Sequence, residues 1–255
     1  MDLNLDSKTV LITGGASGIG KAICTQFWEA GANVIILDTN TEKVKVLLDE
    51  LTTKDRTPTH FNVDISHSKA LESLGDSCNS LDILVNCAGI SHIGTIEDTS
   101  EADFDRLYSV NVKGIFNVTK SFIPIFKKKK SGVILNITSV AATVGISERF
   151  AYSMTKGAAL SMTYSIAKDY INYGIRCNSI SPARIHTPFV DDYLQQHYPK
   201  EVEKMFQKLS KTQPIGRMGT PKEVADLALF LCSDKAKFIT GTDFPIDGGF
   251  LKLNT

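Results

Sequence analysis

The sequence predicts an α/β protein, with one doubly wound sheet of about seven parallel strands and helices on both faces. Three observations lead to this prediction. Short apolar runs alternate with longer segments of helical period along the whole chain. The apolar runs are rich in β-branched residues and several lack polar alternation, which is typical of strands covered on both faces. The longer segments supply the helices that connect parallel strands.

The expected elements follow one another in a regular order. Strands are expected at residues 9–13, 33–38, 59–63, 82–86, 132–138, 175–181 and 242–247. Helices are expected at residues 18–30, 41–52, 67–76, 102–129, 150–173 and 221–232. Repeated strand–helix units connect through right-handed crossovers, which makes the strands parallel. Because the sequence contains no internal repeat and no low-complexity linker, residues 1–255 are expected to form one domain.

Residues 183–215 break this order, because they separate the sixth expected strand from the next expected helix. Ligands of open α/β sheets bind beyond the carboxyl ends of the strands. A long segment that leaves such an end is placed to cover a bound molecule. We therefore expect residues 183–215 to cover a substrate, and whether residues 189–215 close over it stays open.

The composition excludes several classes of protein. A hydrophobic content of 42% and a charged content of 22% are ordinary for a globular domain, and 28 basic residues balance 28 acidic ones. This balance argues against a nucleic-acid or membrane partner. No apolar run approaches the ~18 residues that span a bilayer, and the N-terminus lacks a signal-peptide layout. The five cysteines include no Cys-x-x-Cys pair, which favours reduced, buried thiols over a disulfide or metal site. We expect a cytoplasmic protein that acts on a small molecule.

The first expected strand runs into the glycine-rich stretch TGGASGIG at residues 13–20 and then into a helix. Gly14, Gly18 and Gly20 let the backbone turn tightly and approach a pyrophosphate group. The first turn of the helix then presents unpaired N–H groups to the anion. A glycine-rich turn alone is weak evidence, but its position between a strand and a helix favours a dinucleotide-binding site.

Asp38 ends the second expected strand, eighteen residues after Gly20. A carboxylate at this position accepts hydrogen bonds from both ribose hydroxyls of NAD and repels the 2′-phosphate of NADP. Thr39, Asn40 and Thr41 follow it, so no basic residue compensates for its charge. Asp38 could instead cap the following helix. Its position and its charge together favour the ribose contact, and hence NAD as the cofactor.

Two further strand ends carry features that suit a dinucleotide. Asp64 follows the third expected strand and could accept a hydrogen bond from the adenine amino group. NCAG at residues 86–89 ends the fourth strand with small residues, against which a dinucleotide could lie. Each feature alone could be turn chemistry. Their occurrence at successive strand ends supports one binding site.

Further motifs accompany the two glycine-containing stretches. The full set is TGGASGIG (13–20), NCAG (86–89), Asn111 in SVNVKG, Ser139 in ITSVAA, Tyr152 and Lys156 in YSMTK, SPARIHTP (181–188) and DGG (247–249). With these motifs the chain resembles the short-chain dehydrogenase/reductase (SDR) family over essentially all of its 255 residues. The family often has Pro-Gly where this chain has Pro182-Ala183, which leaves the turn geometry there open.

The resemblance implies a Rossmann fold and an NAD-dependent enzyme that acts on CH–OH groups. It also implies a homotetramer, with helices 102–129 and 150–173 packing across a two-fold interface. The apolar face of residues 153–168 would serve an intramolecular core equally well, so the sequence does not decide the assembly.

The resemblance implies a catalytic set of Asn111, Ser139, Tyr152 and Lys156. Tyr152 and Lys156 lie about one turn apart on the expected helix, although Tyr-x-x-x-Lys alone is a weak pattern. A tyrosine has a reference pKa near 10. A neighbouring ammonium group favours the phenolate and so suits a general base. Ser139 would hydrogen-bond the reacting oxygen, and Asn111 would hold a water molecule near Lys156.

The resemblance also implies the cofactor contacts, with Ile185 and Thr187 at the nicotinamide carboxamide. The residues expected to bind the cofactor are Gly14, Ser17, Gly18, Ile19, Gly20, Asp38, Asp64, Ile65, Asn86, Ala88, Gly89, Tyr152, Lys156, Ile185 and Thr187.

Two arginines flank the catalytic set and bear on the substrate. Arg149 lies three residues before Tyr152, and Arg184 lies in the turn after the sixth strand. Either arginine could pair with a substrate carboxylate, alongside Ser139 and Tyr152 at the reacting carbon. Either could equally be a solvated residue or a bridge between subunits, and both interpretations stay open.

The stretch from residue 181 to residue 219 also resembles SDR relatives that oxidise sugars or sugar acids such as 2-keto-3-deoxy aldonates. We therefore expect an NAD-dependent dehydrogenase that oxidises a secondary alcohol of a sugar or sugar acid. The alternatives are an NAD-linked hydroxysteroid or 3-oxoacyl dehydrogenase/reductase and, with less support, a non-catalytic nucleotide-binding protein.

Overall fold

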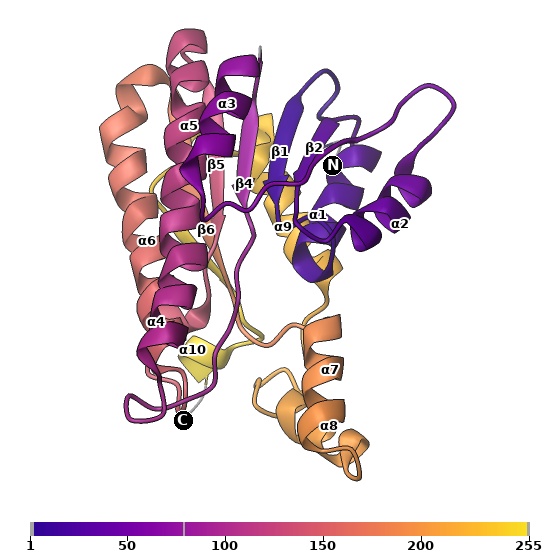
Figure 1. The fold of residues 1–255 in the computed structure, drawn as a ribbon, viewed down its shortest axis with the longest axis vertical. Helices are drawn as coiled ribbons and strands as arrows, with labels where there is room; N and C mark the ends of the chain where they lie inside the picture. The colour runs from indigo at the N-terminus through magenta and orange to yellow at the C-terminus, as the bar shows by residue number, and fades with distance from the viewer. Residues whose placement is uncertain (1–2, 79, 254–255) are drawn as a thin grey trace.

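The structure is a computed structural model that describes residues 3–78 and 80–253. Within these residues the chain forms one parallel sheet of seven strands in the order β3-β2-β1-β4-β5-β6-β7 (Figure 1). This confirms the predicted fold class. The strand order reverses between β1 and β4, and open sheets of this kind bind ligands at such a reversal. The strands are β1 (Thr9–Thr13), β2 (Asn33–Leu37), β3 (Thr59–Phe61), β4 (Ile83–Asn86), β5 (Gly132–Ile137), β6 (Ile175–Pro182) and β7 (Asp243–Ile246).

Helices cover both faces of the sheet, as predicted. In Figure 1, α1, α2 and α9 lie on one side of the strands, and α3 to α6 lie on the other. The helices are α1 (Gly18–Glu29), α2 (Thr41–Leu51), α3 (Ser68–Ser77), α4 (Glu101–Tyr108), α5 (Gly114–Lys129), α6 (Phe150–Tyr170), α7 (Pro188–His197), α8 (Val202–Ser210), α9 (Pro221–Cys232) and α10 (Phe250–Leu253).

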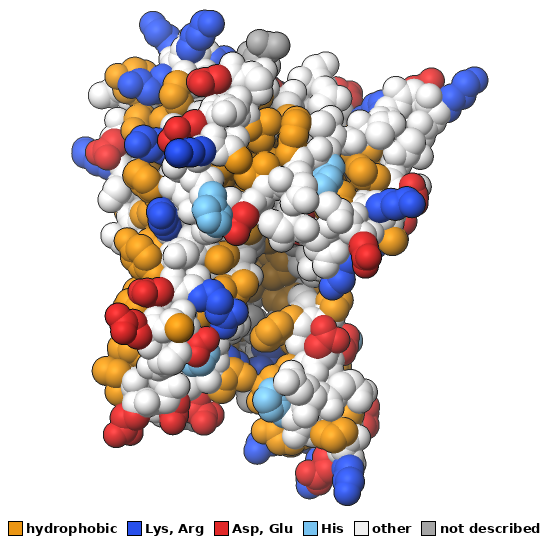
Figure 2. All heavy atoms as spheres, in the orientation of Figure 1, with side chains coloured by type: hydrophobic (Ala, Val, Ile, Leu, Met, Phe, Trp, Pro, Cys, Tyr) orange, Lys and Arg blue, Asp and Glu red, His pale blue; other side chains and the backbone are white. Residues whose placement is uncertain are grey.

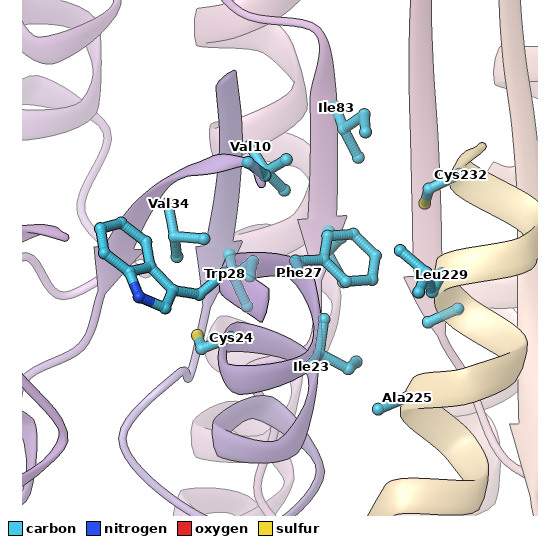
Figure 3. Close-up of a cluster of buried hydrophobic side chains, with 14 of the residues drawn as sticks. Val10, Ile23, Cys24, Phe27, Trp28, Val34, Ile83, Ala225, Leu229 and Cys232 are labelled. Atoms are coloured by element: carbon cyan, nitrogen blue, oxygen red, sulfur yellow. The ribbon is translucent and has the colours of Figure 1, made fainter. Parts of the chain in front are cut away.

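Each face of the sheet has its own hydrophobic layer, because neighbouring side chains of a strand point to opposite faces. Val10 and Ile12 of β1 pack with α1 and α9, whereas Leu11 packs with α3 and α5. Figure 3 shows the first layer, in which Phe27 of α1 points toward Leu229 of α9. The alternation explains why the strands are apolar throughout.

The helix expected at residues 102–129 is present as one continuous helical stretch, but a π-helical turn divides it into two α-helices. Helix α4 ends at Tyr108, a π-helical segment spans Ser109–Lys113, and α5 then continues to Lys129. The π-helical turn accommodates an extra residue, a feature that is frequent at functional sites. Asn111 lies in this turn and is only 1% exposed. Asn111 of this turn bonds to Ile90 and Thr155, which are distant in the sequence, so a local pattern did not reveal the turn.

Residues 183–215, which separated the predicted elements, contain two helices. Helices α7 and α8 form a hairpin that projects beyond the carboxyl ends of the strands (Figure 1). Val190 and Leu194 of α7 pack with Met218 and with half-buried Phe206 of α8. The hairpin therefore has a small hydrophobic cluster of its own. No helix in the described part of the chain is long and apolar enough to cross a membrane.

Candidate active site

The glycine-rich stretch packs its backbone against the segment that follows β4. Gly14 has a φ of +68°, and a Cβ placed on it would lie 2.7 Å from the Cα atom of Ala88. Thr13 holds the two segments together, because its Oγ1 accepts hydrogen bonds from the N–H groups of Cys87 (3.1 Å) and Ala88 (3.0 Å). We did not predict this role of Thr13. Its position at the end of a strand, directly before a glycine, could have indicated this role in the sequence.

The N-terminus of α1 is uncapped, whereas Asn40, Ser100 and Thr220 cap α2, α4 and α9. Among the described residues, Ser17 makes no side-chain hydrogen bond to the first turn of α1. Free N–H groups at a helix start favour an anion such as a phosphate. A Cβ on Gly18 would lie 3.4 Å from Thr187 Cγ2, so the start of α1 faces the start of α7.

Asp38 lies beside the glycine-rich stretch. Its Oδ2 accepts a hydrogen bond from the N–H of Ala16 (2.9 Å) and its Oδ1 from the N–H of Asn40 (2.9 Å). A carboxylate has about four acceptor positions, so both oxygens retain capacity for a further donor. Helix α2 is capped by Asn40, which accepts from the N–H of Lys43 at 3.0 Å.

The other predicted adenine-side residues take different positions. Asp64 follows β3 and accepts from the N–H of Ser66 at 2.9 Å. Burial alone would raise the pKa of Asp64, but the hydrogen bonds from Ser66 and the charge of His67 lower it below its ordinary value. Ile65 is buried, and its carbonyl oxygen accepts from Asn117 Nδ2 at 2.9 Å.

Asn86 is buried between strands and helix, and its side chain does not join the glycine-rich stretch. Its Nδ2 donates to Asn136 Oδ1 (2.9 Å) and Thr119 Oγ1 (3.3 Å). Its Oδ1 has no hydrogen-bond partner within residues 3–78 and 80–253. Any contact between Asn86 and a dinucleotide would therefore come from its backbone.

Lys156 lies near the Tyr152 ring and also contacts the end of β5, two residues before Ser139. The Nζ atom of Lys156 lies 5.8 Å from the centre of the Tyr152 ring. Lys156 is only 6% exposed, and its Nζ donates to the carbonyl oxygen of Ile137 at 2.9 Å. Ser139 Oγ accepts from the N–H of Ala141 at 3.2 Å, which leaves its own hydrogen for another acceptor.

Asn111 connects this group to the segment after β4. Its Oδ1 accepts from the N–H of Ile90 (2.8 Å), and its Nδ2 donates to the carbonyl oxygen of Ile90 (2.9 Å) and to Thr155 Oγ1 (3.0 Å). A Cβ on Gly89 would lie 3.3 Å from Asn111 Oδ1 and 3.4 Å from Lys156 Nζ. Thr155 also donates to the carbonyl oxygen of Tyr152 at 2.8 Å. Sequence reasoning missed Thr155, although its place between Tyr152 and Lys156 was a signal.

The two arginines lie close enough to influence each other. Arg149 Nη1 donates to the carbonyl oxygen of His92 at 3.1 Å and lies 3.4 Å from Ser91 Oγ. Arg184 Nε is buried and has no acceptor in the described part of the chain. Burial lowers the pKa of the Arg184 guanidinium, and the positive charge of Arg149 lowers it further, against an opposing effect of Tyr193. Figure 2 shows the surface hollowed between the α7–α8 hairpin and the helices opposite it.

Comparisons with known proteins agree with this geometry. A family model described as enoyl-(acyl carrier protein) reductase matches residues 14–251. Dehydrogenase/reductase SDR family member 6 of Aquarana catesbeiana is 38% identical over 248 residues, covering 96% of this chain and 98% of that protein. Oxidoreductase UcpA of Salmonella typhimurium is 37% identical over 250 residues, covering 96% and 95%. The ligand-free aldohexose dehydrogenase of Thermoplasma acidophilum has a TM-score of 0.87 at 33% identity, covering 100% of this chain and 98% of that one.

The chain belongs to the short-chain dehydrogenase/reductase family. This SDR is therefore an oxidoreductase that acts on CH–OH groups with a nicotinamide dinucleotide cofactor. The residues present fit such a cofactor. The close backbone approach at Gly14 and the uncapped start of α1 suit a pyrophosphate, and the carboxylate of Asp38, beside the glycine-rich stretch, suits the hydroxyl groups of a ribose.

Most residues predicted for the site come together at the carboxyl end of the sheet. Ile185 is buried and pairs with Gly219, and Thr187 starts α7 opposite Gly18. Asn86 is the clearest exception, because its side chain lies in the interior.

Proposed function

We propose that this SDR oxidises a secondary alcohol of a sugar or sugar acid by transferring a hydride to NAD. The observation that carries the proposal is that Lys156 lies near the Tyr152 ring and binds the end of β5, two residues before Ser139. Arg149 and Arg184 influence each other electrostatically and flank this group in the sequence. The acid substrate that we favour is a 2-keto-3-deoxy aldonate. The similarity to an aldohexose dehydrogenase supports a carbohydrate substrate.

In this proposal Tyr152 is the general base. It removes the proton of the substrate hydroxyl while the hydride leaves the carbon atom that carries this hydroxyl. Lys156 places its ammonium group near the Tyr152 ring, and the carbonyl oxygen of Ile137 holds that group in place. The Ser139 hydroxyl donates to the reacting oxygen, which orients the substrate.

The remaining residues hold the cofactor and exclude water. A nicotinamide dinucleotide, when bound, would supply the acceptor for the hydride. The backbone of residues 14–20 and the start of α1 would hold its phosphates, and Ile185 and Thr187 would hold its carboxamide. Asn111 fixes the segment after β4 near Lys156. In the proposed reaction it would also hold a water molecule for proton exchange with the solvent. Helices α7 and α8 cover the substrate.

The experiment that tests this function is NADH formation at 340 nm with sugars, aldonates, 2-keto-3-deoxy aldonates, steroids and hydroxyacyl thioesters. We expect turnover on a sugar or sugar acid.

Tyr152→Phe should lower kcat by about a thousandfold, because it removes the general base, and leave the Kd for NADH within about twofold. Tyr164→Phe, which alters an exposed tyrosine of the same helix, is the control. Turnover on steroids or acyl thioesters alone would favour the alternative enzymes, and Tyr152→Phe with full activity would contradict the proposed base.

Two alternatives follow from other observations. The description of the matching family model favours a reductase of acyl thioesters, and a hydroxysteroid dehydrogenase would use the same catalytic group. Both would leave Arg149 and Arg184 without a substrate charge to bind. A non-catalytic nucleotide-binding protein would not need Ser139, Tyr152 and Lys156 together.

The preference for NAD is attributed to Asp38. Its carboxylate lies beside the glycine-rich stretch, and its free acceptor positions suit two ribose hydroxyls. A 2′-phosphate at the same place would face an unscreened like charge.

Asp38→Asn should lower the ratio of kcat/KM with NAD to kcat/KM with NADP by about tenfold or more, because it removes the repulsion of the phosphate. The ratio is measured from initial rates with both dinucleotides. Asp64→Asn, at the next strand end, is the matched control and should weaken both dinucleotides alike. A wild-type enzyme that prefers NADP would refute this reading of Asp38.

The charge of the two arginines supports an acidic substrate. Arg149 and Arg184 lie near each other with like charge, and Arg184 Nε is buried without an acceptor. A carboxylate between them would relieve the repulsion and accept from both guanidinium groups.

Arg149→Ala and Arg184→Ala should each raise KM for the acidic substrate by about tenfold or more, and leave KM for a neutral aldose within about twofold. Steady-state kinetics with both substrates give these values. Arg106→Ala removes an exposed arginine of α4 and should change neither. Unchanged KM for the acid in both site variants would remove the carboxylate contact from the proposal.

A homotetramer is also part of the proposal. Large apolar side chains remain exposed on α4, α5 and α6, namely Phe104, Tyr108, Phe116 and Tyr164. Exposed apolar patches of this kind mark surfaces that other chains cover.

Light scattering should give four times the 27.9 kDa mass of the chain at micromolar concentration. Phe116→Glu should lower the measured mass by placing a charge in the interface. Val46→Glu changes an exposed apolar residue of α2, on the other side of the sheet, and should not. A monomeric wild-type protein would end the tetramer proposal.

A further inference from the structure

A carboxylate without a part in the proposed reaction lies next to the catalytic end of β5. Asp243 begins β7 and pairs in register with Ser179 of β6. Its Oδ1 accepts from the hydroxyl groups of Ser179 (2.6 Å) and Ser181 (2.9 Å), and its Oδ2 lies 2.8 Å from Ser181 Oγ. Thr138 completes the cluster, because its Oγ1 lies 2.8 Å from Ser181 Oγ and 3.4 Å from Asp243 Oδ1.

The hydrogens of this cluster have a consistent arrangement. An ionised carboxylate only accepts, so Ser179 and Ser181 donate to Asp243. The oxygen of Ser181 can then accept from Thr138, whose one hydroxyl hydrogen is shared between Ser181 Oγ and the carbonyl oxygen of Ile180, each at 2.8 Å. Ser179, Ser181 and Thr138 are at most 2% exposed, so water does not replace these bonds. Hydrogen bonds to a charged acceptor are about twice as strong as neutral ones.

Thr138 lies between Ile137, which binds Lys156, and Ser139, which is assigned to the proposed reaction. The residue before it, Ile137, accepts from Lys156 Nζ at 2.9 Å. The residue after it, Ser139, orients its hydroxyl through the N–H of Ala141 at 3.2 Å. The N–H of Thr138 itself donates to the carbonyl oxygen of Ile180 at 2.8 Å. A displacement of Thr138 would therefore move the supports of both Lys156 and Ser139.

We infer that Asp243 is a positioning residue, which acts through Ser181 and Thr138 to hold Ser139 and Lys156 in their reactive arrangement. The inference rests on the roles proposed above for Ser139 and Lys156. If Asp243 had a purely structural role, it would only join β7 to β6. The Ala141 amide distinguishes a positioning role from this structural role, because its N–H donates to the Ser139 hydroxyl and so depends on the position of that hydroxyl.

Asp243→Asn keeps the shape of the side chain but turns one acceptor oxygen into a donor that faces hydroxyl groups. Hydrogen exchange of the whole protein, resolved to single residues by mass spectrometry, should show about tenfold faster exchange at the Ala141 amide. Asp82→Asn is the matched control. Asp82 is also largely buried and accepts from the N–H of Thr9 at 2.9 Å, but it precedes β4 at the opposite end of the sheet. It should leave exchange at Ala141 within about twofold of the wild type.

Turnover supplies an independent readout, measured with NAD and the most active compound of the substrate panel. Asp243→Asn should lower kcat by about tenfold through misplacement of the reacting groups, with the Kd for NADH within about twofold. Thr138→Val removes the hydroxyl through which Asp243 acts. The double variant should therefore have the kcat of Thr138→Val alone, within about twofold.

Equal exchange at Ala141 in Asp243→Asn and Asp82→Asn would overturn the inference, as would independent, multiplicative losses of kcat in the double variant. If Asp243→Asn does not fold, Ser181→Ala removes the connecting hydroxyl while it keeps the charge, and it should show the same exchange at Ala141. Its failure to do so would be equally decisive. Faster exchange without turnover on any panel compound would contradict the proposed function and leave the positioning role supported.

Discussion

The close approach of Gly14 to Ala88 is the constraint on which the cofactor end of the molecule depends. It occurs where β1 and β4 lie side by side and the strand order reverses. A side chain at residue 14 would meet the backbone of Ala88, and the Thr13 hydroxyl binds two amides of the same segment. Because the two strand ends are joined in this way, the glycine-rich stretch contacts both Asp38 and residues 86–89.

The catalytic end depends on polar contacts within an otherwise apolar interior. Lys156 is buried, and burial of a charge is costly unless hydrogen bonds compensate for it. The carbonyl oxygen of Ile137 provides that compensation at the end of β5. Asn111, in its π-helical turn, binds both backbone groups of Ile90 and so attaches α5 to the segment after β4. The supports of the site are therefore main-chain groups at strand ends, which rigid parallel pairing holds in place.

In the proposed site, the half that would bind the cofactor and the half that would bind the substrate are built differently. Backbone groups and glycines shape the first half, and they act alike for any dinucleotide. Side chains from separate segments shape the second half, namely Arg149 before α6 and Arg184 after β6, next to the α7–α8 hairpin. Substrate specificity is therefore expected to vary through a few side chains while the cofactor half stays unchanged.

The sequence by itself determined the seven strands, their parallel direction, the glycine-rich turn and the placement of Tyr152 one helical turn from Lys156. These features follow from local chemistry, because hydrophobic period and glycine content act over a few residues. Only the tertiary structure decided the π-helical turn at Asn111, the two helices within residues 183–215 and the interior position of the Asn86 side chain. It also decided the cluster around Asp243, which lies 105 residues from Thr138 in the chain. Such contacts depend on which strands are neighbours in the sheet, and a local sequence pattern carries no information about distant neighbours.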